Sequence, residues 1–152
     1  MTYEALLDYA DSQNVIVREK NIPGYGGRIY NNRIAIRKDL ETQAEKSCML
    51  AEELGHYHKN YGDILDQTDT RNQKQEYKAR LWGYNTQIGL LGIIQAFEHG
   101  CQNSYEAAEF LDVPEEYFIN AINCYRQKYG IYTTVDNYTV FFEPTLAVYK
   151  SR

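Results

Sequence analysis

Cysteine and long apolar runs are both scarce in this chain of 152 residues. Its three cysteines, Cys48, Cys101 and Cys124, are odd in number, widely spaced and set among apolar residues. This pattern is typical of reduced, buried thiols and is a poor basis for a zinc knuckle or a catalytic nucleophile. No apolar stretch approaches the length that spans a bilayer, and the acidic first residues do not resemble a signal peptide. We therefore expect a cytoplasmic protein with no membrane partner.

Positive charge is also in deficit. The chain has 16 Lys and Arg against 21 Asp and Glu, which gives a net charge of -5 and an isoelectric point near 5.2. This balance argues against broad electrostatic binding to nucleic acid, although it leaves room for a local basic face. The sequence has no repeats, low-complexity tracts or linkers, and its length is that of one domain or one compact core with a small addition.

The first 36 residues predict a helix followed by a small sheet. Residues 3–12 have apolar side chains at helical spacing. A β-branched run within residues 14–19 and a turn-rich segment follow, and then two short apolar runs flank Asn31-Asn32. This pair suits a tight two-residue turn, so the runs predict a hairpin. With the preceding strand, the hairpin would form a three-stranded antiparallel sheet.

Two helices are expected next. Asp39 is a candidate N-cap for a helix that carries its apolar residues from Leu40 to Leu54 toward the sheet. Gly55 lies inside this pattern, which favours close packing on a neighbouring element over a helix end. After a polar loop, residues 72–97 form the longest helical pattern, which glycines at several points could bend or interrupt.

The C-terminal part predicts a helical pair and a hairpin. Residues 103–111 and 115–129 read as two helices, with Ser104 as a candidate N-cap, and they resemble a helix-turn-helix. Glu115 and Glu116 would face DNA phosphates from the second helix, so we expect this pair to pack on protein, and we do not expect direct nucleic-acid binding. Residues 131–142 then predict a terminal β-hairpin. The predicted fold class is α+β.

The most informative stretch closes the first of the two central helices. Glu52 and His56 are four residues apart and therefore share one helix face, with Glu53 beside them. This is the layout of HExxH, in which two histidines hold a metal and the glutamate activates water, except that Glu52 stands at the first histidine. A carboxylate can ligate zinc through oxygen. The alternative interpretation is an exposed acidic face on an ordinary helix.

This combination resembles the ImmA/IrrE family of zinc metallopeptidases, whose members carry Ala-His-Glu-Leu-Gly-His-Tyr on a helix after a small sheet. The corresponding residues here are 51–57, and a second match is Glu76 followed by Ala79. The form Glu-Glu-Leu-Gly-His is similar to a phage-borne branch of that family. The resemblance extends over about residues 1–130 in the order of elements, but only these two motifs are sharp.

The resemblance implies a minimal zincin-like fold and a zinc site. Glu52, His56 and Glu76 would be the metal ligands, and His58 or Asp63 are possible substitutes for the missing histidine. Glu53 would be the general base. Residues 1–100 would form the metallopeptidase domain, with residues 101–152 packed on it as part of one compact unit. The implied reaction is cleavage of a helix-turn-helix repressor of a phage or mobile element; the alternative is a degenerate member that binds a repressor or other protein without cutting it.

Overall fold

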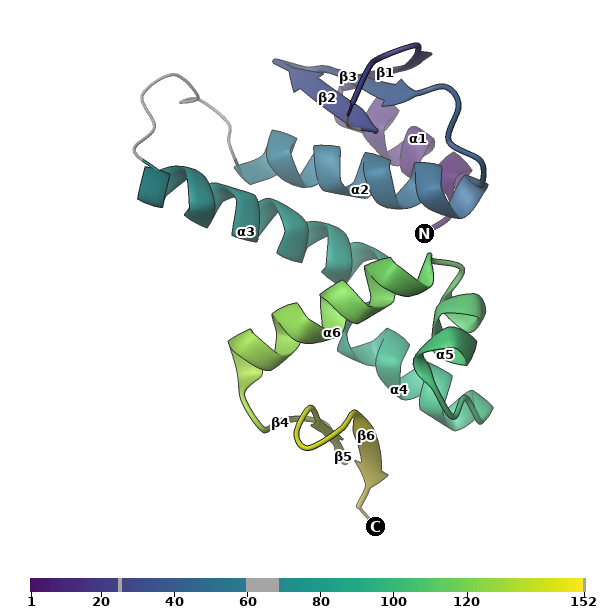
Figure 1. Ribbon diagram of the computed structural model, residues 1–152, viewed down its shortest axis with the longest axis vertical. Coiled ribbons are helices and arrows are strands. Elements are labelled where there is room, and N and C mark those ends of the chain that lie inside the picture. Colours follow the sequence, from purple (N-terminus) through teal and green to yellow (C-terminus); the bar gives the residue numbers. More distant parts are fainter. Residues whose placement is uncertain (25, 60–68, 152) are drawn as a thin grey trace. The chain divides into compact units, whose positions relative to one another are not determined.

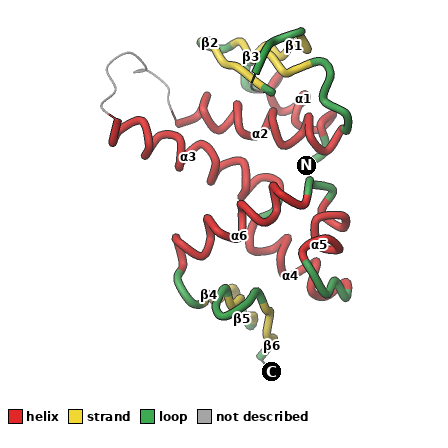
Figure 2. The backbone as a smooth tube through the Cα atoms, in the orientation of Figure 1, coloured by secondary structure: helices red, strands yellow, loops and turns green. Residues whose placement is uncertain are grey.

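The chain is organised as two compact units, Met1–Thr86 and Gln87–Arg152, each with helices and one three-stranded sheet (Figures 1 and 2). The computed structural model describes residues 1–24, 26–59 and 69–151. The α+β class expected from the sequence is confirmed. The elements of the first unit are α1 (Tyr3–Ser12), β1 (Ile16–Lys20), β2 (Gly27–Tyr30), β3 (Arg33–Arg37), α2 (Gln43–Lys59) and α3 (Asp69–Gln87), which ends one residue beyond the unit.

The sheet of the first unit is mixed, so the prediction of an antiparallel sheet is wrong. β2 and β3 form the expected hairpin, with Asn31 at a positive φ of 53°. β1, however, pairs with β3 in parallel, and the strand order is β1-β3-β2. β3 takes the centre because it carries Ile34 and Ile36, which are 2% and 0% exposed. Apolar alternation shows which segments are strands, but it does not show which strands lie side by side. The expected order β1-β2-β3 and the observed order β1-β3-β2 bury the same side chains.

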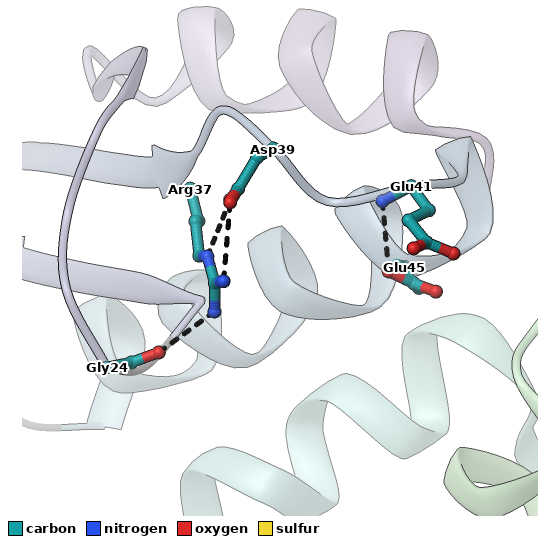
Figure 3. A network of polar contacts seen from close by, with 5 residues as sticks. All are labelled: Gly24, Arg37, Asp39, Glu41 and Glu45. Carbon is teal, nitrogen blue, oxygen red and sulfur yellow. Dashed lines mark hydrogen bonds and ion pairs between the residues drawn. The ribbon is translucent and has the colours of Figure 1, made fainter.

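Arg37 ties the end of β3 to the loop that leads from β1 to β2. Its guanidinium donates to both carboxylate oxygens of Asp39, at 2.6 and 3.3 Å, and to the Gly24 carbonyl at 3.1 Å (Figure 3). Asp39 is therefore not the N-cap of α2. That place belongs to Thr42, whose hydroxyl accepts from the Glu45 amide at 3.1 Å, so the prediction was three residues early.

α2 lies between the sheet and α3 (Figure 1). Its apolar face, which includes Leu50, Ala51 and Leu54, is fully buried in a core shared with α1 and β3. On the side toward α3, a Cβ at Gly55 would overlap the Ala79 carbonyl. The expected use of Gly55 for close packing is confirmed: only a residue without a side chain allows this approach.

The long helix expected over residues 72–97 is divided at Gly89. α3 ends at Gln87, and α4 (Gly89–His99) begins with Gly89 at a φ of 66°, a left-handed conformation that interrupts a helix and favours glycine. α4 then contacts α5 (Ser104–Leu111) and the second sheet. The division between the two compact units falls close to this interruption, after Thr86.

The second unit packs its helices around large side chains. α5 and α6 (Glu115–Tyr129) form the expected pair, but the N-cap of α5 is Asn103, whose side chain accepts from the Glu106 amide at 2.8 Å, and not Ser104. Phe118 and Tyr125 of α6 are 1% and 0% exposed. The Tyr125 hydroxyl accepts from the Gly89 amide at 3.2 Å, which ties α6 to the start of α4.

The C-terminal hairpin is present and is extended by a strand that the sequence analysis missed. β4 (Tyr132–Val135) and β5 (Tyr138–Phe141) pair antiparallel across Asp136-Asn137, and β6 (Ala147–Lys150) pairs with β5. β6 is only four residues long and buries one side chain, Val148, so its apolar pattern is too short to stand out. None of the helices in the described part of the chain is long and apolar enough to cross a membrane.

Candidate metal centre

Helices α2 and α3 bring together Glu52, His56 and Glu76. One ligand atom from each side chain lies within 4.8 Å of the others, and within the described ranges this is the one group of three His, Cys, Asp or Glu residues with such a spacing. Glu52 and His56 share a face of α2 because they are one helical turn apart. Glu76 comes from α3, which the Gly55–Ala79 contact holds close to that face. Two helices therefore converge on one small cluster of ligand atoms.

The spacing of these atoms is compatible with a metal ion. Zinc ligands lie about 2.0–2.2 Å from the ion, so neighbouring ligand atoms in a tetrahedral site are about 3.4 Å apart. His56 Nε2 and Glu76 Oε2 are 3.5 Å apart. The side chains are 29% (Glu52), 12% (His56) and 45% (Glu76) exposed, so the cluster is half-buried. An ion held by these three side chains would keep a position for water, as in catalytic zinc sites, because the cluster is partly open to solvent.

Glu53 is the buried acid of the cluster. Its residue is 7% exposed, and burial raises the pKa of its carboxyl to about 7, with further upward contributions from the charges of Glu52 and Glu76 and a downward one from Arg28. A cation held by Glu52 and Glu76 would offset the two charge contributions and leave burial as the main cause. A carboxyl with a pKa near neutrality can both accept and return a proton, which is what a general base in hydrolysis has to do.

Gly27 of β2 makes the space that Glu53 occupies. A Cβ at Gly27 would lie 2.9 Å from Glu53 Cγ and 3.0 Å from Glu53 Oε1. The strand backbone thus covers Glu53 and contributes to its burial. The sequence analysis saw only a turn-rich segment before the hairpin and gave no sign of this contact, which depends on how the sheet packs on α2.

Arg80 is a second residue that the sequence analysis missed. Its Nε lies 3.9 Å from Glu52 Oε1, and its side chain is 54% exposed. The signal was available, because Arg80 follows Glu76 by four residues and so shares its helix face. Arg80 neutralises part of the charge of Glu52.

One of the two suggested substitute ligands, His58, does not join the cluster. His58 Nε2 is 2.8 Å from the Tyr9 hydroxyl, and its ring lies 4.9 Å from that of Trp82, so His58 packs among aromatic side chains of α1 and α3. This follows from helix geometry, since positions 56 and 58 point to opposite sides of α2. Asp63 lies outside the described residues.

Fold and site together define an α+β protein with a candidate metal centre between two helices. Comparison with protein-family models, with curated proteins and with solved structures finds no match to this chain.

Proposed function

We propose that this protein is a zinc-dependent endopeptidase of the cytoplasm. The observation that carries the proposal is the convergence of Glu52, His56 and Glu76 within 4.8 Å beside the buried Glu53. Glu52, His56 and Glu76 would hold the ion, and Glu53 would serve as the general base. When bound, zinc supplies a Lewis acid that polarises a carbonyl and lowers the pKa of water.

The other steps of hydrolysis depend on the protein's own residues. Glu53 takes a proton from the attacking water and returns it to the leaving amine, for which a pKa of about 7 is suitable. The backbone at Gly27 lies against the Glu53 side chain and limits its access to solvent. Glu52 adds a negative charge that a histidine would not, so it weakens the Lewis acidity of the ion and slows hydrolysis relative to a two-histidine site.

The proposed substrate is a helix-turn-helix repressor of a phage or mobile element. Support for it is limited to the resemblance of residues 51–57 and of Glu76 with Ala79 to the ImmA/IrrE pattern. A repressor gene encoded next to this one would identify the protein to use as substrate. Cleavage is then measured with the purified pair.

The decisive experiment separates metal binding from chemistry. Bound zinc is measured after dialysis for the wild type and for Glu53→Gln, His56→Ala and Glu76→Ala. We expect about one zinc per chain in the wild type and in Glu53→Gln, and none in the two ligand variants. Glu53→Gln should lower cleavage by at least about 100-fold because the general base is lost. Absence of zinc from the wild type, or full cleavage by Glu53→Gln, would contradict the proposal.

A second candidate function is stoichiometric binding of a repressor or other protein without cleavage. It is favoured by the contacts of Glu52 with Arg80 and of His56 with Glu76, which satisfy the cluster as ion pairs when the histidine is protonated. The variant Glu52→His distinguishes the two functions. A peptidase should bind zinc more tightly and cut faster with this change, whereas a non-catalytic binder should keep its partner affinity and show no cleavage.

A further inference from the structure

The sheet of the first unit has a face that points away from α1 and α2. Side chains alternate along a strand, and Ile34 and Ile36 occupy the core face of β3. The strand register then puts five cations on the opposite face, which no described helix of Met1–Thr86 covers (Figure 1). These cations are Arg18, Lys20, Arg28, Arg33 and Arg37. We call this surface the basic sheet face.

No carboxylate stands at a paired strand position of the basic sheet face. The three other positions at paired sites on it are Ile16, Tyr30 and Ala35. Five cations on one sheet face, of which only Arg37 pairs with a carboxylate, are unexpected in a chain whose net charge is -5. Charge summed over the whole sequence concealed this arrangement, because strands from three parts of the first 37 residues contribute to it.

Four of the five cations keep their charge available. Arg37 is held by Asp39 at 2.6 Å (Figure 3). In the part of the chain that the structure describes, the other four form no ion pair with a carboxylate. The hydrogen bonds of Arg18 and Arg28 go only to backbone carbonyls, at 3.0 and 3.3 Å, and the charge of Arg28 also acts on the Glu53 carboxyl without a direct ion pair. All four are exposed, as a binding surface for an anion requires.

An aromatic ring stands among these charges. Tyr30 is 75% exposed, and its position in the register is directly opposite Arg33. The surface forms an open hollow of about 580 Å³ that both residues line. Arginine binds phosphate through two parallel hydrogen bonds and also stacks on bases, and an exposed aromatic ring stacks on any base. An acidic peptide would use the cations but not the exposed ring, and a membrane would need more apolar side chains than Ile16 offers.

We propose that the basic sheet face binds single-stranded nucleic acid. Arg18, Lys20, Arg28 and Arg33 contact the phosphate backbone, and the Tyr30 ring stacks on a base. Cations at alternate positions of a strand are about 6.8 Å apart, so they line up along the strand direction and suit an extended, repeating polyanion. The proposal does not depend on the metal centre, since it concerns the opposite face of the sheet and is tested by binding alone.

The test measures binding of the full chain to a fluorescent 12-nucleotide oligothymidylate between 50 and 200 mM salt. Four phosphate contacts on a single strand predict that the logarithm of the affinity falls with the logarithm of salt with a slope of about -3. Arg18→Gln with Arg33→Gln should reduce this slope by about half and weaken binding on the order of tenfold at 100 mM salt. The matched control, Lys128→Gln with Lys150→Gln, removes the same charge from the second unit and should stay within about twofold.

Tyr30→Ala tests the stacking contact separately. It should weaken binding on the order of tenfold without changing the salt slope, because the ring carries no charge. Absence of binding at 50 mM salt would overturn the proposal, as would equal losses in the arginine pair and in its lysine control. Tighter binding of polyglutamate, or of phosphatidylserine vesicles, with the same dependence on Arg18 and Arg33 would overturn it too and assign the face to an acidic protein or a membrane surface.

Discussion

The two units are built from similar parts but differ in how their helices meet. In Met1–Thr86, α2 and α3 approach through Gly55 and Ala79, which are too small to separate the backbones. Charged side chains on the two helices then come within reach of one another. In Gln87–Arg152 the helices pack around Phe118 and Tyr125, and the described residues of this unit contain no comparable cluster of ligand atoms. Small residues at a helix–helix contact thus allow polar side chains of the two helices to approach one another, whereas large residues form an apolar core.

The units also differ in charge. Residues 1–86 contain 12 Lys and Arg against 13 Asp and Glu, and residues 87–152 contain 4 against 8. Residues 81–125 have no Lys or Arg at all. Both signs are therefore abundant only in the first unit, where five of the 12 cations share one sheet face and Glu52, Glu53 and Glu76 lie at the candidate metal centre. The second unit is acidic and has the more aromatic core.

The largest predicted effect on stability tests whether the second unit has an apolar core but no part in metal binding. Phe118→Ala removes a ring that is 1% exposed and should lower the free energy of unfolding of that unit by about 3–5 kcal/mol. Zinc stoichiometry should not change, because all the proposed ligands lie in the first unit. Segment-resolved hydrogen exchange measures the first quantity and metal analysis the second. Loss of zinc from this variant would show that the comparison is wrong.

A smaller effect is expected at the contact between α2 and α3. Gly55→Val forces a side chain against the Ala79 carbonyl and should cost about 1–3 kcal/mol of unfolding free energy. It should also abolish zinc binding, since α3 carries Glu76 away from His56. Urea unfolding and metal analysis of the purified variant test both results.

Gly92→Ala is the matched control for that variant in the second unit. Its Cβ would lie 3.3 Å from Leu111 Cδ2, a flexible side chain that can move, and alanine favours a helix over glycine by about 0.5–1 kcal/mol. We expect stability within about 1 kcal/mol of the wild type and unchanged zinc binding. If the two glycine variants had the same stability and the same zinc content, Gly55 would have no special role in bringing α2 and α3 together.

The smallest effect concerns the contact between the first sheet and α2. The hydrogen bond from Lys46 Nζ, at 2.9 Å, lowers the pKa of the Glu19 carboxyl, with further lowering by the Tyr3 hydroxyl. Because the folded-state pKa is below the unfolded one, the stabilisation is present above the usual carboxyl pKa and is lost as the pH falls through the lowered value. Glu19→Gln should reduce the loss of unfolding free energy at acid pH by less than about 1 kcal/mol, since the ion pair is partly exposed. Urea unfolding from pH 7 to pH 3 measures this effect, with Glu4→Gln as the control. If Glu19→Gln and the wild type lose the same free energy of unfolding over this range, the contact between Lys46 and Glu19 does not stabilise the fold.

Much of the fold could be predicted because it depends on local patterns. The bounds of α1, residues 3–12, were predicted from apolar spacing alone, and the turn at Asn31-Asn32 from the residue types that accept a positive φ. Gly55 was recognised as a packing glycine from its place inside a helical pattern. The shared face of Glu52 and His56 follows from the helical repeat. Glu76 was indicated only through the resemblance to ImmA/IrrE.

The sequence by itself determined most of the helices, the two hairpins and the shared helix face of Glu52 and His56, because each depends on neighbours within about one or two turns. Tertiary structure alone decided that β1 lies beside β3, that β6 extends the second sheet and that His58 points toward Tyr9. It also decided that Gly27 covers Glu53 and that five cations share one sheet face. These features depend on contacts between residues far apart in the chain, and such contacts leave no periodic signal in a single sequence.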